Sequence, residues 1–127
     1  MLIETLFAAG PMSGETWRGL FDPGVHLRIG NRRPALCLEP ALKELKRLLA
    51  RVDSFGGYRD VWEVRDATWI ETEMHRDRGA SALVIPCAIV FRTGGRPLAL
   101  DVRFYCDVSP LFPRSAPPRR SGAGRTN

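Results

Sequence analysis

The sequence lacks the short motifs that define most enzyme classes. Its three cysteines, Cys37, Cys87 and Cys106, form no CxxC pair and no metal-ligand spacing. Its two histidines have no third ligand at metal spacing, so we expect no metal and no cofactor. A Gly-rich phosphate loop, HExxH, GxSxG and an EF-hand loop are all missing. These absences exclude the motif-defined zinc proteases, serine hydrolases and P-loop nucleotide-binding proteins.

Long apolar runs are missing too. No stretch approaches the ~20 residues that a membrane-spanning helix needs, and we expect no membrane partner. The first residues, Met1 to Glu4, contain no basic region ahead of an apolar stretch, so we expect no secretory signal. Unpaired cysteines without such a signal predict reduced thiols and a cytoplasmic location.

Acidic residues are absent from residues 109–127, which hold four arginines. The rest of the chain has 15 basic and 14 acidic residues, so the formal net charge of +5 comes mainly from this tail. A nearly neutral body predicts no nucleic-acid partner. The Pro, Gly, Ser and Arg composition of residues 113–127 predicts disorder, with an electrostatic tether as the alternative. Residues 1–112 then form a single domain, as expected for a chain of 127 residues.

The first half of the chain is mainly helical in pattern. Apolar spacing predicts helices over residues 2–9 and from Ser13 to Phe21. A turn at residues 22–24 precedes a short strand over residues 25–29. Pro40 suits the first turn of the clearest helix, whose apolar stripe is Leu42, Leu45, Leu48 and Leu49. The charged residues around this stripe are expected to be solvated: Lys43, Glu44, Lys46, Arg47 and Arg51.

From residue 58 onward the pattern changes to strands. We expect four of them, over residues 59–64, 68–75, 83–91 and 98–108, with a hairpin loop at residues 93–96. The strand over residues 83–91 is apolar at both its odd-numbered and its even-numbered positions, so we expect both of its faces to be covered. Helices segregated against a curved, mixed or antiparallel sheet make an α+β architecture.

Three segments together carry a family likeness: FDPGVHLRIG, EPALKELKRLL and VIPCAIVFRTGGRPLALDVRFYCDVSPLF. In order and spacing they resemble the SnoaL-like branch of the nuclear transport factor 2-like superfamily, over about Trp17 to Phe112. The resemblance implies a cone of curved sheet, wrapped by N-terminal helices around an apolar pocket. It also implies a relation to polyketide cyclases, ketosteroid isomerase, limonene epoxide hydrolase and scytalone dehydratase. A shared fold does not fix the reaction.

The chain departs from those enzymes at positions that matter for catalysis. The isomerase and the epoxide hydrolase carry polar catalytic residues on the first strand, where this chain has Leu27 and Ile29. The epoxide hydrolase also has an aspartate on the last strand where this chain has Phe104. Neither activity is supported residue by residue.

His75 is the strongest candidate for chemistry. By the resemblance it stands where the epoxide hydrolase has a catalytic aspartate, and an imidazole can give and take a proton near neutral pH. Period two places Glu73 on the same strand face, where it could orient the ring. The alternative is that this face is solvated or lies at a dimer interface.

Two further strands offer polar groups. Tyr58, Asp60 and Trp62 share a strand face by period two, and Tyr58 and Asp60 are candidate substrate contacts. On the last strand, Asp101, Arg103 and Tyr105 fall opposite Phe104, so an ion-pair ladder is expected there rather than catalysis. Asp107 fits a turn cap in its D-x-S-P setting. Cys87 and Cys106 are expected to be buried and inert.

These observations leave two functions open. The first is a cofactor-independent cyclase, isomerase, dehydratase or epoxide hydrolase that acts by proton transfer on an apolar, oxygenated small molecule. His75, Glu73, Asp60 and Tyr58 would be its polar residues. The second is a non-catalytic module of the same fold that binds a hydrophobic ligand or dimerises. In both, we expect a homodimer burying at least ~1,200 Å², and these pocket-wall residues: Trp17, Leu27, Ile29, Leu83, Ile85, Phe91, Val102 and Phe104.

Overall fold

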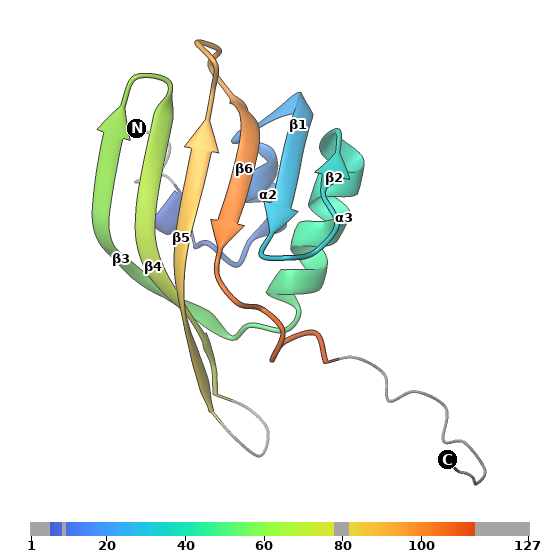
Figure 1. The fold of residues 1–127 in the computed structure, drawn as a ribbon, viewed down its shortest axis with the longest axis vertical. Helices are drawn as coiled ribbons and strands as arrows, with labels where there is room; N and C mark the ends of the chain where they lie inside the picture. The colour runs from blue at the N-terminus through green and yellow to red at the C-terminus, as the bar shows by residue number, and fades with distance from the viewer. Residues whose placement is uncertain (1–5, 9, 78–81, 114–127) are drawn as a thin grey trace, which may run out of the picture.

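The computed structural model describes residues 6–8, 10–77 and 82–113. Within these residues, the helices α2 and α3 and six strands follow one another along the chain (Figure 1). Their order is α2 (Gly14–Arg18), β1 (Phe21–Ile29), β2 (Ala35–Leu36), α3 (Leu38–Leu49), β3 (Ser54–Val64), β4 (Ala67–Arg76), β5 (Leu83–Arg92) and β6 (Ala99–Tyr105). The predicted tail lies almost entirely outside the described residues. Of the first predicted helix, residues 6–8 are described, and they are helical.

All six strands form one curved sheet in the order β2-β1-β6-β5-β4-β3. Strands β3 to β6 make an antiparallel meander, as predicted. β1 pairs in parallel with β6, and β2 adds an antiparallel edge to β1. Both labelled helices lie on one side of the sheet (Figure 1), which leaves the other side uncovered by them. We call the helix-covered side the inner face and the opposite side the outer face. The α+β architecture predicted from the sequence is confirmed.

The turn expected at residues 22–24 lies inside β1 rather than ahead of it. β1 begins at Phe21, and its register against β6 shifts between Phe21 and His26. Within the irregularity, the Asp22 Oδ1 atom accepts a hydrogen bond of 2.9 Å from the Gly24 backbone N–H. The Asp-Pro-Gly segment therefore makes its turn as a bulge while the strand continues on both sides.

The helix predicted to reach Phe21 ends at Arg18. Leu20 and Phe21 are still buried, but Phe21 already belongs to β1. In α3 the predicted apolar stripe is buried as expected, and the helix begins two residues before Pro40. Glu44 was expected to be solvated and is instead buried, with 7% of its surface exposed.

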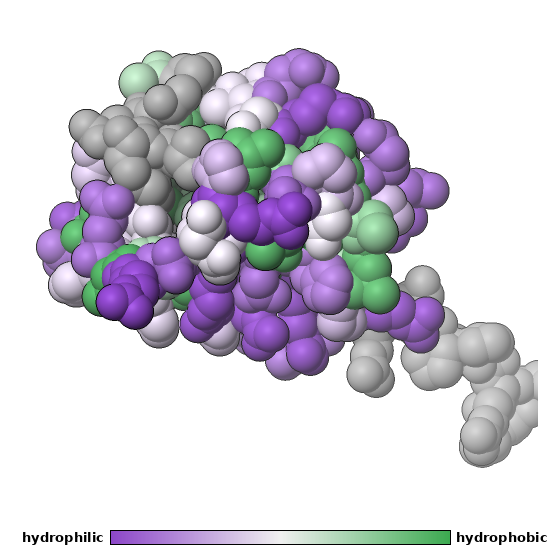
Figure 2. Space-filling view, turned by 90° about the horizontal axis from the view of Figure 1, so that it is seen from above, coloured by the Kyte–Doolittle hydropathy of each residue, from purple (hydrophilic) through white to green (hydrophobic). Residues whose placement is uncertain are grey.

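The core lies between the inner face and the helices. Trp17 on α2 packs against rings from three strands, with centroid separations of 6.2 Å to Phe21, 6.0 Å to Phe91 and 5.7 Å to Phe104. Its indole N–H donates to the Pro11 carbonyl at 2.5 Å, so the ring is also anchored through its polar atom. At the end of the molecule seen in Figure 2, apolar side chains show between hydrophilic ones. Neither described helix is long and apolar enough to cross a membrane.

Candidate functional site

Glu73 and His75 lie next to each other on the outer face of β4. The His75 Nε2 atom is 3.2 Å from the Glu73 Oε1 atom. The second oxygen of Glu73 accepts a hydrogen bond of 2.8 Å from the Arg59 Nη2 atom on β3. The carboxylate is therefore held between an imidazole and a guanidinium. The imidazole and carboxylate side chains are 29% and 25% exposed, so solvent reaches both.

A glycine on the neighbouring strand makes room for this pair. A Cβ atom at Gly56 would lie 3.0 Å from the His75 Nε2 atom and 3.6 Å from the Glu73 Oε1 atom. A side chain there would push the imidazole aside by a few tenths of an ångström. The hydrogen-bonded pair thus depends on β3 as well as on β4.

A cleft of about 400 Å³ opens on the sheet beside Glu73. The carboxylate of Glu73 and the guanidinium of Arg59 line this cleft, and the imidazole of His75 contacts that carboxylate from outside the lining. Such groups can exchange protons with a ligand and bind an oxyanion. The cleft is lined by residues of β3, β4, β5 and β6: Arg59, Glu71, Thr72, Glu73, Pro86, Cys87, Ala88 and Tyr105.

The eight predicted wall residues lie on the other side of the sheet. Seven of them are buried, and Leu83 is half-buried against the core. β4 pairs with β5 so that Met74 faces Ile85 in the core while His75 faces Val84 on the outer side. The structure therefore does not bring the predicted wall together with Glu73 and His75.

The inner face offers little chemistry of its own. Within the described part of the chain, the buried polar or charged residues are Glu44, Thr68 and Thr72. Thr72 donates its hydroxyl to the Gly57 carbonyl, and Glu44 is paired with arginines at α3. The buried interior that the structure describes thus holds no histidine and no unpaired carboxylate to transfer a proton.

Tyr58 and Asp60 do not share a face, which corrects the prediction from period two. The β3–β4 register shifts on both sides of Tyr58, so Tyr58 pairs with the buried Thr72 whereas Asp60 pairs with the outward Glu71. The Tyr58 ring packs edge-on against Phe7, with centroids 5.3 Å apart. Each register shift in a strand changes whether its odd-numbered or its even-numbered residues point inward. Alternation alone therefore misplaced Tyr58.

The polar residues of β6 form the expected ion-pair ladder. Asp101 lies 3.1 Å from Arg103 and 3.5 Å from Arg92, all on the outer face. The charge of Asp101 raises the pKa of Arg103. Beyond β6, the Asp107 Oδ1 atom accepts hydrogen bonds from the Ser109 hydroxyl at 2.7 Å and its backbone N–H at 3.0 Å. These bonds lower the pKa of Asp107, and its predicted role as a turn cap is confirmed.

The cysteines differ in environment. Cys87 is buried and Cys106 is partly buried, and a hydrogen bond between their thiols, together with burial, raises the pKa of Cys87. Cys87 is therefore a poor nucleophile, as expected. Cys37 is exposed just before α3, where its φ of 75° lies in the left-handed region.

Two arginines that bind carboxylates were not predicted from the sequence. Arg59 was not singled out, although it holds Glu73. Arg32 was not singled out either, yet it binds the buried Glu44 of α3. The burial of Glu44 could have been predicted from its position on the helix. Glu44 lies one turn from Ala41 and one turn from Leu48, so it borders the apolar stripe.

No protein-family model and no curated protein sequence matches this chain. Solved structures do. A SnoaL-like polyketide cyclase candidate from Jannaschia sp. CCS1 superposes with a TM-score of 0.70 at 15% identity, covering 92% of this chain and 93% of that one. A hypothetical protein with a ketosteroid isomerase-like fold from Catenulispora acidiphila DSM 44928 gives 0.67 at 14% identity, covering 86% and 85%.

A third solved structure is an epoxide hydrolase of M. tuberculosis that resembles limonene epoxide hydrolase. Its TM-score is 0.65 at 16% identity, and the match covers 87% of this chain and 84% of that one. At such identities the agreement concerns the fold and not the reaction. The order of the strands, the helices on one face and these superpositions together show that the chain has the nuclear transport factor 2-like fold, as the sequence resemblance implied.

Proposed function

We propose that this protein is a non-catalytic module of the nuclear transport factor 2-like fold that works as a homodimer, two copies packing through their outer faces. The observation that carries the proposal is a patch of large, exposed apolar side chains on that face. We call it the outer patch. Its members are Trp62, Val64, Trp69, Val84 and Tyr105, which are 51%, 62%, 39%, 56% and 47% exposed.

Four members of the outer patch lie close together on neighbouring strands, whereas Val84 lies further along β5, opposite His75. Trp62 on β3 pairs directly with Trp69 on β4. The Trp69 ring stacks on Tyr105 of β6, with centroids 6.4 Å apart and planes 8° from parallel. Because β5 lies between β4 and β6, the two rings meet over it, beside Ala88 and Val90. Soluble monomers rarely expose several large apolar side chains side by side.

The charges around the outer patch suit a second copy of the same surface. Arg59 with Glu73, and Arg92 and Arg103 with Asp101, place both signs on this face. A twofold interface brings one surface patch against itself, so it needs both signs to be self-complementary. An acidic or basic partner would instead meet a mixture of charges.

Light scattering at micromolar concentration tests the dimer directly, and we expect twice the monomer mass. Trp69→Glu should convert it to monomer, because a charge would enter the centre of the interface. Leu36→Glu is the matched control: Leu36 is 55% exposed on β2, at the far edge of the sheet, and should leave the dimer intact. A monomeric wild-type protein overturns the proposal.

A second candidate function rests on the 3.2 Å contact between His75 and Glu73. In it the protein is an acid/base enzyme, with His75 exchanging the proton and Glu73 orienting the ring for a substrate in the adjacent cleft. Asp60 on the same outer face is a further polar contact, and Tyr58 belongs to the other side. Non-catalytic dimerisation is preferred because Glu73 and His75 face away from the apolar wall that would hold an apolar substrate.

Turnover separates the two functions. A panel of epoxides and polyketide-like ketones is assayed with wild-type protein, His75→Gln and the control His26→Gln, an exposed histidine on β1. Acid/base catalysis predicts a loss of ~10²–10⁴-fold for His75→Gln and none for the control. Glu73→Gln should cost less, because an orienting carboxylate does not hold the proton. Equal rates for all variants would remove His75 from the mechanism.

A further inference from the structure

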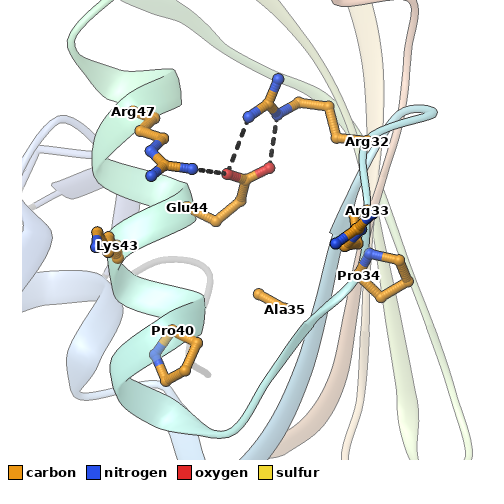
Figure 3. A pocket seen from close by; sticks show the side chains of 8 residues that line it. All are labelled: Arg32, Arg33, Pro34, Ala35, Pro40, Lys43, Glu44 and Arg47. Atoms are coloured by element: carbon orange, nitrogen blue, oxygen red, sulfur yellow. Dashed lines mark hydrogen bonds and ion pairs between the residues drawn. The ribbon is translucent and has the colours of Figure 1, made fainter.

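A second cluster of charges lies at the opposite edge of the sheet from the outer patch, between α3 and the loop that follows β1. Glu44 points from α3 toward this loop and accepts two hydrogen bonds from Arg32, 2.6 Å from Nε and 3.1 Å from Nη2 (Figure 3). Arg47, one turn further along α3, approaches the same carboxylate at 3.5 Å. The carboxylate side chain is 9% exposed. Two guanidiniums therefore converge on one buried acid.

Aromatic and backbone contacts hold the guanidiniums of Arg32 and Arg51 in place. The Arg32 guanidinium lies over the Phe112 ring, with its Cζ atom 3.8 Å from the ring centroid. Arg51 approaches the same ring at 4.4 Å and donates a hydrogen bond of 2.8 Å to the Arg47 carbonyl. Arg32 is thus bonded along one edge and stacked on one face, which limits its rotamers. A guanidinium fixed in this way loses little entropy when it binds a ligand.

Positive charge is in excess at this cluster. The guanidiniums border a cleft of about 420 Å³, which Arg33 and Lys43 also line. Four cationic side chains thus line the cleft, together with the single carboxylate of Glu44. Arg33 and Lys43 are exposed, and neither forms an ion pair within the residues the structure describes. Because the body of the chain is nearly neutral, this excess is local and does not belong to a generally basic surface.

We propose that this cleft binds the phosphate group of a small organic phosphate. Guanidiniums bind phosphate oxygens through paired N–H donors, and a dianion matches an excess of positive charge. Glu44 is the positioning residue, because it orients Arg32 and Arg47 without neutralising the cluster. Pro34, Ala35 and Pro40 give the cleft an apolar side against which the organic part can pack. The site is independent of the proposed dimer.

Calorimetric titration with phenyl phosphate, inorganic phosphate and benzoate tests the site. We expect one site per chain, with phenyl phosphate binding more tightly than the other two probes and more weakly as salt is added. Arg33→Gln/Lys43→Gln should weaken phenyl phosphate binding at least about tenfold, because each substitution removes a charge-assisted contact. These residues are exposed and unpaired among the described ones, so the fold should survive, as circular dichroism would verify.

The matched control is Arg65→Gln, which removes an exposed arginine at the β3–β4 turn, far from the cleft. It should bind phenyl phosphate like the wild type. Trp69→Glu should do so too, which separates this site from the proposed dimer. Equal binding by wild type and Arg33→Gln/Lys43→Gln would overturn the proposal, as would tighter binding of benzoate than of phenyl phosphate.

Discussion

The two faces of the sheet are built from the same strands and differ in what covers them. On the inner face, Trp17 from α2 closes over Phe91 and Phe104, and all three are at most 3% exposed. On the outer face, Trp62, Trp69 and Tyr105 remain 39–51% exposed. Both faces are rich in aromatic side chains. Aromatic content therefore did not decide which face became the core; the side taken by the helices did.

The candidate acid/base pair and the predicted pocket wall also lie on different faces of the sheet. Glu73 and His75 belong to the exposed face, whereas the apolar wall belongs to the covered face. An exposed pair keeps its solvation, and a buried pair would have needed further partners to offset its desolvation. Matched substitutions on the two faces can test whether residues of the inner face contribute more to stability than residues of the outer face.

The largest expected effect comes from adjacent residues of β6. Phe104→Asp removes a ring from the core and buries an unpaired carboxylate, so we expect the free energy of unfolding to fall by at least about 4 kcal/mol. In a single copy, Tyr105→Asp makes a similar change on the outer face and should cost only about 1 kcal/mol, mainly through the lost stack on Trp69. Urea unfolding at a protein concentration low enough to dissociate the proposed dimer measures both. Similar losses under that condition would show that a single copy covers its outer face as well as its inner one.

Two tryptophans give the next contrast. Trp17→Ala leaves a cavity among three rings and should cost ~3–5 kcal/mol. Trp62→Ala, on the exposed patch of a single copy, should cost less than about 1 kcal/mol. Thermal unfolding at a protein concentration low enough to dissociate the proposed dimer compares them, with a Tm decrease several times larger expected for Trp17→Ala. At a concentration where the dimer forms, the decrease for Trp62→Ala should grow, because its ring is then buried against the partner copy; an unchanged decrease would contradict the proposed interface.

Adjacent glycines in β3 separate backbone strain from side-chain room. Gly57 has a φ of 77° and open space where a Cβ would be, so Gly57→Ala should cost ~1–2 kcal/mol without disturbing His75. Gly56→Ala should instead displace the imidazole from Glu73. NMR of the His75 ring protons, together with Tm, distinguishes the two. An unchanged His75 spectrum in Gly56→Ala would contradict the close approach.

The smallest expected effect is at Asp107. Its pKa is lowered in the folded protein by hydrogen bonds from Ser109, so the carboxylate stabilises the fold above its ordinary pKa of 3.8. That contribution is lost as the pH falls below this value through the folded-state pKa. Asp107→Asn should therefore lower Tm slightly at neutral pH and converge with the wild type in acid. Ser109→Ala should show a smaller version of the same convergence, and a difference that grows in acid would contradict the assignment.

Most strands could be predicted because their patterns are local. β4, β5 and β6 alternate, or stay apolar throughout, over seven or more residues, and the structure places them within a few residues of the predicted bounds. The ion pairs of β6 followed once Phe104 was taken to face inward. Tyr58 was misplaced because the register shifts around it depend on how β3 pairs with β4, which alternation within one strand does not contain.

The sequence by itself determined the order of the helices and of every strand except the two-residue β2, the apolar residues that fill the core and the turn at Asp107, because each depends on neighbours within a few residues. Only the tertiary structure decided that Glu73 and His75 face away from that core, that Tyr58 lies on the inner side of the sheet beside Phe7, and that Arg32 binds Glu44. These outcomes require segments far apart in the chain to meet: strands in a particular register, helices on a particular face, and a loop against a helix. Their free energy comes from contacts that exist only after the chain has folded.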